Sequence, residues 1–160
     1  MKKLTILFLS IICLGQFSFS QEIDTKKYCK QIKTQVDKFE GETKYTTPLL
    51  KQISFIKIIH GENELNYMMI STIGLTPATG EGVILLLENG EKVIFNNVKT
   101  EVNVNSSAQF EHSAFITLTK DNIELLKKYN ITDARLYIFD MKIKDPIQYR
   151  AYLMCLDEMK

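Results

Sequence analysis

The most regular hydrophobic pattern in the chain lies between residues 82 and 95 and predicts a β-hairpin. Residues 83–87 form an apolar run, residues 93–95 are again apolar, and Asn89-Gly90 stands between them. Asn-Gly favours a two-residue type I′ turn because both residues tolerate positive φ angles. We therefore expect two antiparallel strands joined at this dipeptide.

A two-residue turn also fixes which residues face each other. It places Glu88 opposite Glu91 and Leu86 opposite Val93. One face then gathers the residues predicted to be buried together, which are Ile84, Leu86, Val93 and Phe95. The apolar run continues on the other face, so the hairpin should be at least partly covered there too.

Six other segments have the composition or alternation of strands, namely residues 36–45, 52–59, 65–73, 101–105, 110–118 and 134–139. Segments 52–59 and 65–73 should pair as a second hairpin with a longer loop, because polar residues 60–64 separate them. A turn is expected at residues 105–107. Alternation in segment 110–118 puts four residues on one face, which are His112, Ala114, Ile116 and Leu118.

Helical spacing predicts three helices. Residues 24–32 favour a short helix that carries Cys29, and residues 121–129 follow Asp121 and Glu124, which resemble a capping box. Residues 145–159 begin with Asp145 as the expected N-cap and Pro146 at the first helical position. The apolar stripe of this last helix makes it the expected cover for the second face of the central hairpin.

These elements predict one α+β domain. It should be mainly an antiparallel β-sheet or sandwich, with a short helix between the late strands and a C-terminal helix packed on the sheet. Residues 115–139 read as strand, helix and strand, and two arrangements fit them. The helix could cross over between parallel strands, or it could bridge two sheets.

The N-terminus has the pattern of a secretory signal peptide. Two lysines precede an apolar run over residues 4–14, and small and polar residues follow, so cleavage is expected before Gln21. The run is shorter than the roughly 20 residues that a membrane anchor needs. A lipoprotein signal would need a small residue before Cys13, where the chain has Ile12. We expect residues 1–20 to be removed and residues 21–160 to form a single exported, β-rich globular domain, periplasmic or extracellular.

Charge excludes some classes of partner for the exported domain. The chain has 20 basic and 19 acidic residues, and loss of Lys2 and Lys3 leaves 18 basic residues against 19 acidic ones. A nearly neutral domain lacks the basic surface that nucleic-acid binding or charge-driven membrane binding requires. After signal cleavage no integral membrane segment is expected.

The two cysteines of the expected domain, Cys29 and Cys155, lie near its opposite ends. In an oxidising compartment they can form one disulfide, which would stabilise the fold by about 4 kcal/mol by constraining the unfolded chain. The alternative is two separate buried thiols.

Candidate catalytic groups are few. The two histidines, His60 and His112, form no pair with ligand spacing alongside Cys, Asp or Glu, so neither a metal site nor a cofactor site is expected. No catalytic residue is assigned. A small hydrolase would have to combine His112 or His60 with a serine such as Ser113 or Ser71. Glu88 and Glu91 at the turn are expected to be solvated.

Several segments resemble small exported proteins of Bacteroidetes bacteria that are uncharacterised. These segments are residues 37–42, 53–57, 82–92, 113–116 with 118–119, and 131–137. They are strand and turn signatures and not catalytic motifs. The resemblance implies an envelope location and no activity.

Three hypotheses for function remain. The first is an exported non-catalytic binding or interaction module for an unknown protein or small molecule, because the elements of a complete fold are present without a reactive cluster. The second is the small periplasmic hydrolase. The third is a β-barrel that binds an apolar small molecule.

Overall fold

The computed structural model of the protein describes residues 23–49 and 52–160. The expected signal peptide, residues 1–20, lies outside the described residues. Nine described strands form one antiparallel sheet in the order β1-β2-β3-β4-β7-β6-β5-β8-β9. The strands are β1 (Lys33–Asp37), β2 (Glu42–Thr46), β3 (Ile53–His60), β4 (Asn63–Gly74), β5 (Glu81–Leu87), β6 (Lys92–Val104), β7 (Phe110–Leu118), β8 (Ile131–Leu136) and β9 (Phe139–Lys142). This confirms the predicted antiparallel α+β fold.

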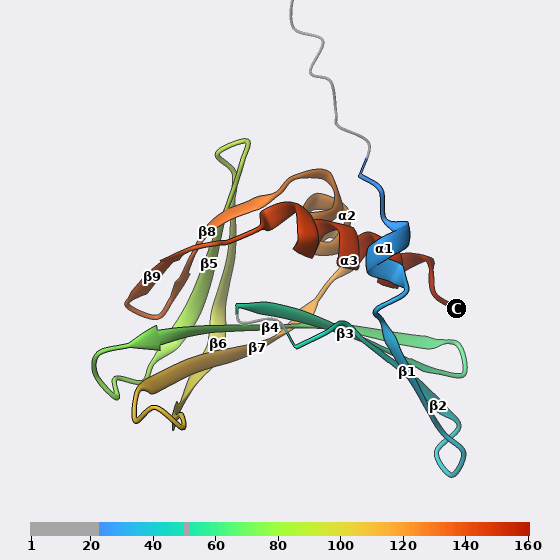
Figure 1. Ribbon diagram of the computed structural model, residues 1–160, viewed down its shortest axis with the longest axis horizontal. Helices are drawn as coiled ribbons and strands as arrows, with labels where there is room; N and C mark the ends of the chain where they lie inside the picture. The colour runs from blue at the N-terminus through green and yellow to red at the C-terminus, as the bar shows by residue number, and fades with distance from the viewer. Residues whose placement is uncertain (1–22, 50–51) are drawn as a thin grey trace, which may run out of the picture.

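Strand β6 divides the sheet into two parts that meet at an angle (Figure 1). Its second half pairs with β7, and its first half pairs with β5. We call the part that contains β1, β2, β3, β4, β7 and the end of β6 the large subsheet. The small subsheet contains the start of β6, β5, β8 and β9. The strand order is linear, so the described strands form an open sheet and not the closed barrel of the third hypothesis.

Three described helices are α1 (Lys26–Cys29), α2 (Lys120–Lys128) and α3 (Pro146–Glu158). Helix α3 lies in the angle between the subsheets, where it packs against β3 and β8 as well as α1 and α2 (Figure 1). Its buried side chains are Tyr149, Ala151, Tyr152, Leu153, Cys155 and Leu156. The predicted C-terminal helix on the sheet is therefore confirmed. It covers the face of the sheet that lies inside this angle, which we call the inner face. The sequence predicted instead that it would cover the second face of the central hairpin.

The central hairpin is present, but its predicted register is wrong by one residue. Ile84 pairs with Ile94 and Leu86 pairs with Lys92, so the loop contains three residues, 88–90. Only Gly90 in this loop has a positive φ, at 85°, which is the pattern of a three-residue loop and not of a type I′ turn.

Glu88 accounts for the longer loop because it is held by a distant residue. Its backbone N–H donates to the carbonyl oxygen of Asn130 at 2.9 Å, and its carboxylate accepts from the Asn130 backbone N–H at 3.1 Å and side-chain amide at 2.7 Å. Glu88 consequently pairs with the loop before β8 and not with Glu91. This contact joins positions 42 residues apart.

The slip exchanges the two faces of β5. Val83, Leu85 and Leu87 are buried, whereas Ile84 and Leu86 are only half-buried and face outward. On β6 the expectation was closer, because Val93 is buried and the partly buried Phe95 packs against the core. The predicted cluster of Ile84, Leu86, Val93 and Phe95 is therefore wrong for its two β5 members.

Three other strand predictions need correction. Residues 36–45 contain a turn, so they belong to a hairpin of β1 and β2. Residues 101–104 belong to the long strand β6, which ends before residue 105. Residues 134–136 end β8, residues 137–138 form a turn, and residue 139 begins β9. The hairpin of β3 and β4 is confirmed, but its loop is shorter than expected, because His60 pairs with Asn63 and Gly61 takes a φ of 59°.

Helix α2 connects strands of different subsheets. It follows β7 of the large subsheet and precedes β8 of the small one, so the bridging arrangement is the observed one. Its N-cap is Thr119 and not Asp121. The Thr119 hydroxyl accepts from the Asn122 N–H at 3.2 Å, and the Asn122 side chain accepts from the Thr119 N–H at 3.1 Å. Pro146 begins α3 as expected, but Asp145 makes no side-chain cap and takes a φ of 52°.

Within 23–49 and 52–160, no helix has both the length and the apolar character that crossing a bilayer requires.

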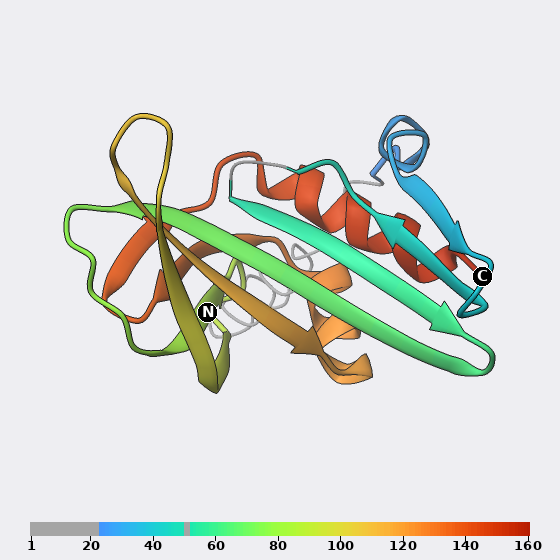
Figure 2. The same cartoon turned by 90° about the horizontal axis from the view of Figure 1, so that it is seen from below.

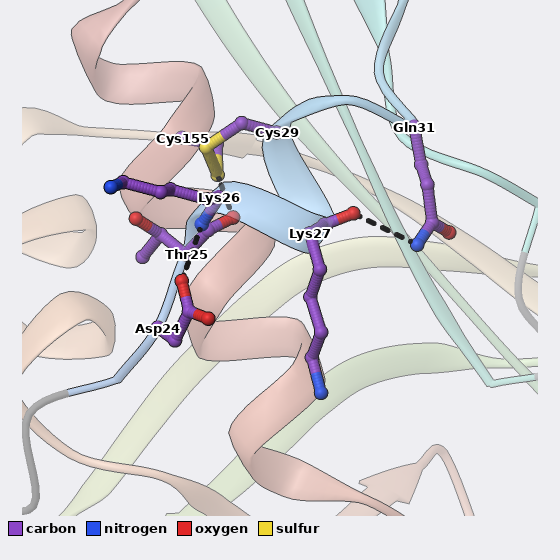
Figure 3. The surroundings of a disulfide bond; sticks show 7 residues. All are labelled: Asp24, Thr25, Lys26, Lys27, Cys29, Gln31 and Cys155. Carbon is purple, nitrogen blue, oxygen red and sulfur yellow. Dashed lines mark hydrogen bonds between the residues drawn. A yellow bond between two sulfur atoms is a disulfide. The ribbon is translucent and has the colours of Figure 1, made fainter.

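The predicted disulfide between Cys29 and Cys155 is present and attaches α1 to α3 (Figure 3). Tyr28 of α1 meets Tyr152 of α3 edge to face, with ring centroids 5.3 Å apart. The Tyr152 hydroxyl also donates to Gln31 Oε1 at 2.7 Å. The covalent bond is thus embedded in aromatic and polar contacts that hold the start of the domain on its last helix.

Reduction should weaken the fold substantially. We expect a reductant to lower the free energy of unfolding by about 4 kcal/mol, because the unfolded chain regains the entropy of a long loop. Urea unfolding with and without dithiothreitol measures the difference. The double variant Cys29→Ser with Cys155→Ala is the control and should not respond to the reductant. Equal stability of the reduced and oxidised wild-type protein would contradict this account.

Lys57 is a buried charge near the end of α3. Its side chain is only 2% exposed, its Nζ lies 3.1 Å from Glu64 Oε2, and it donates to the carbonyl oxygen of Asp157 at 3.4 Å. Burial by itself raises the pKa of the Glu64 carboxyl, but hydrogen bonds from Asn66 and Lys57 outweigh that effect, so its pKa lies below the ordinary value. The more exposed Glu64 carboxylate therefore stabilises the buried positive charge of Lys57.

Removing the two partners should have unequal effects. Glu64→Gln leaves a buried lysine charge without its carboxylate and should cost about 3 kcal/mol, whereas Lys57→Met leaves a solvated glutamate and should cost less. Because the pKa of Glu64 is lowered on folding, its contribution is present above pH 4.5 and is lost as pH falls through the folded pKa. Urea unfolding should therefore show the wild type and Glu64→Gln converging in acid. A larger loss for Lys57→Met would contradict the prediction.

Candidate functional site

The two histidines occupy very different environments. His60 is exposed at the end of β3, beside the turn that leads into β4. His112 is fully buried on β7, with its Nε2 3.0 Å from the carbonyl oxygen of Thr76 and its ring 4.0 Å from that of Phe139. The His112 ring is therefore enclosed by the fold, whereas His60 is open to solvent.

The serines of the hydrolase hypothesis lie on the other face of the sheet from His112. Ser113 pairs directly with Ser71 across β7 and β4, whereas His112 pairs with Thr72. Directly opposed residues share a face and consecutive residues alternate, so neither serine points toward His112. His60 lies at the opposite end of the β3–β4 hairpin from Ser71. The structure therefore brings neither histidine together with either serine.

Across residues 23–49 and 52–160, no group of three or more His, Cys, Asp or Glu side chains is placed to hold a metal ion.

A surface that combines apolar and charged side chains lies on the outer face of the small subsheet, which is the face away from α3. Its eight residues form two rows that each cross four strands in the order β6, β5, β8, β9. We call this surface the outer grid. One row is Ile94, Ile84, Arg135 and Asp140, and the other is Lys92, Leu86, Asp133 and Lys142.

The outer grid is hollow and amphipathic. Seven of its residues, all but Ile94, line a hollow of about 400 Å³ together with Ala134 and Met141. The β5 and β6 side is apolar around Ile84 and Leu86, and Ile94 beside them is 54% exposed. The β8 and β9 side is charged. A ligand on this surface would meet an apolar strip and a charged strip side by side.

Two of its charges neutralise each other. Arg135 grips Asp140 with two hydrogen bonds, one of them 2.9 Å from Nη2 to Oδ2. The hydrogen bonds from Arg135 hold the pKa of the Asp140 carboxyl below its usual range, and the carboxylate raises the pKa of Arg135 in return. This pair is therefore ionised and oriented at neutral pH.

The other three charges of the outer grid have no such partner. Lys92, Asp133 and Lys142 form no ion pair with any residue of the described chain, although Asp133 and Lys142 are opposed across β8 and β9. Lys92 and Lys142 are exposed and Asp133 is half-buried, so these charges are free to meet a ligand of opposite charge.

Sequence reasoning missed the outer grid because it placed Ile84 and Leu86 inside. The apolar run 83–87 was taken to require a cover on its second face, and none of the described elements provides one. A signal was available in β8, where Asp133 and Arg135 alternate with the buried Ala134 and Leu136 and so mark one face as polar.

Comparison with family models, with curated proteins and with solved structures found no match to this chain.

The two faces of β5 should respond differently to the same substitution. Leu85→Thr removes a fully buried side chain and buries a hydroxyl, so it should cost about 3 kcal/mol. Ile84→Thr on the outer grid should cost about 1 kcal/mol or less, because Ile84 is only half-buried and the β-branched threonine suits a strand. Urea unfolding of both variants makes the comparison. If Ile84→Thr cost more stability than Leu85→Thr, the result would support the register of a two-residue turn and contradict the one described here.

Proposed function

We propose that the chain is an exported, non-catalytic binding module and that the outer grid is its binding surface. The observation that carries the proposal is an apolar strip, Ile84, Leu86 and Ile94, beside the unpaired charges of Lys92, Asp133 and Lys142. This combination supports binding in two separable ways.

The apolar strip supplies affinity. Burial of apolar surface contributes about 25 cal/mol per Å², and a half-covered strip retains area that a ligand can remove from water. An apolar patch framed by polar residues is typical of an interaction site.

The charges supply orientation. Lys92 stands at the β6 end of its row, and Lys142 stands at the β9 end beyond Asp133. A partner must present its own charges in matching order to bind without leaving these groups desolvated and unpaired. We expect a partner with an apolar centre and charges at its edge, either a protein surface or an amphipathic small molecule.

Export is part of the proposal. It is supported by the N-terminal signal pattern, by the resemblance to exported proteins, and by a disulfide that is suited to an oxidising compartment. Catalysis has no comparable support, because the geometry keeps His112 buried and on the other face of β7 from Ser71 and Ser113.

Matched variants test the binding surface. Ile94→Glu places a charge in the apolar strip, and Val36→Glu places the same charge at another exposed apolar strand position, 59% exposed on β1. We expect a partner captured from envelope extracts, or a small molecule that raises the thermal midpoint, to bind Ile94→Glu at least tenfold more weakly. The control Val36→Glu should bind like the wild type.

Two results would overturn this proposal. One is a partner or ligand that binds both variants with wild-type affinity, because the outer grid would then not be its site. The other is the absence of any partner from extracts together with the absence of any stabilising ligand.

A further inference from the structure

Strands β6 and β7 pair over only part of their length. Their ladder joins Thr100–Val104 to Phe110–Ala114 and then ends, although β6 extends back to Lys92 and β7 continues to Leu118. The two strands separate from this point, as the yellow-green β6 and the gold β7 show in Figure 2. We call the space between their diverging parts the fork.

The fork is an open cleft of about 540 Å³. Strand β6 contributes Phe95, Val98 and Lys99 to its lining, and β7 contributes Phe115 and Thr117. The fork and the outer grid have no residue in common, so an occupant of one does not depend on the other.

The direction of backbone groups on β7 follows from two hydrogen bonds elsewhere in the sheet. The Thr100 N–H donates to Gly80, on the β5 side, so the backbone of the next residue, Glu101, faces β7 and its partner Ser113. The Ser71 N–H donates to Gln52, on the β3 side, so Ser113, opposite Ser71, does not use its backbone toward β4. Both bonds assign the Ser113 backbone to the β6 side.

Every second residue of β7 repeats this direction. The backbone groups of Phe115 and Thr117 therefore point toward β6. The Phe115 N–H still belongs to the ladder, because the last pair, Thr100 with Ala114, is flanked by a bond from Phe115 to the carbonyl oxygen of Lys99. The Phe115 C=O and both backbone groups of Thr117 lie beyond this pair and point into the fork. Ile116 and Leu118 use theirs toward β4. A strand edge with free donors and acceptors is a template for another extended chain.

The side chains around this edge favour a peptide. Phe115 is 53% exposed and stacks on Tyr67 with ring centroids 4.9 Å apart, which forms an aromatic platform beside the edge. Lys99 and Glu101 line the β6 side of the fork, two residues apart, and neither forms an ion pair within the described part of the chain. Opposite charges two residues apart on an extended peptide would match them.

We propose that the fork binds an extended segment of a partner polypeptide by strand addition to β7. The Phe115 carbonyl oxygen and the Thr117 N–H and carbonyl oxygen form the new ladder. An apolar side chain of the peptide lies on the Tyr67–Phe115 platform, and an acidic and a basic residue at positions i and i+2 face Lys99 and Glu101.

The probe is a library of random 12-residue peptides displayed on phage and selected against the purified exported protein. We expect selected peptides to contain an apolar residue and the i, i+2 charge pair. Addition of a synthetic selected peptide should slow hydrogen exchange of the protein's Thr117 amide at least tenfold, as measured by NMR.

Thr117→Pro removes the amide that faces the fork and leaves the β4 ladder its donors at Ile116 and Leu118. It should weaken binding at least tenfold, whereas Thr117→Val should bind like the wild type. The double variant Lys99→Glu with Glu101→Lys is a second test, which remains valid even if Thr117→Pro fails to fold. It should select peptides in which the two charges are reversed.

Three results would overturn the proposal. The first is a selection that yields no peptide above background. The second is a selected peptide that leaves the Thr117 amide unprotected and is insensitive to the charge exchange. The third is a dimer of the protein in solution with the fork already closed, which would assign this edge to a second copy of the chain. None of these results bears on the outer grid.

Discussion

Helix α3 in the angle of the bent sheet is the packing interaction on which the remaining structure depends. The inner faces of both subsheets turn their apolar residues toward this angle, including Phe55 and Ile70 from the large subsheet and Leu85 and Leu136 from the small one. Tyr152 of α3 is fully buried in the same core. Because one helix and its neighbours occupy the inner side, the described elements leave the outer faces to water. The surfaces available for binding are therefore a direct result of where the core is.

The sequence predicted those elements whose alternation is local and uninterrupted. Residues 110–118 form β7 with the expected bounds, and His112, Ala114, Ile116 and Leu118 are buried as their spacing indicates. Pro146 marks the start of α3 for an equally local reason. The central hairpin was different, because Asn89-Gly90 fits two loop lengths and the choice between them depends on Asn130, far away in the chain. A contact of that range leaves no trace in a short sequence window.

The same distinction explains the candidate sites. The outer grid depends on the register of β5, so a one-residue error concealed Ile84 and Leu86 from a sequence-based search. The fork depends on the bend in β6, which the sequence marks only faintly. In the first part of β6 the inward positions are odd-numbered, Val93 and Phe95. After the irregular pairing between β5 and β6, they are even-numbered, the partly buried Val98 and the buried Thr100. The residue types were visible, but only the pairing of strands shows which of them meet.

The disulfide between Cys29 and Cys155 has a consequence beyond folding energy. It closes almost the whole domain into a covalent ring, since the two residues are 126 positions apart. A protease that cuts one surface loop inside this ring cannot release a fragment, because both new ends remain attached through the sulfur bridge. The strands on either side of such a cut would still be held in the same sheet by their neighbours. A single cleavage inside the ring would thus leave the domain in one piece, and two would be needed to remove a part of it.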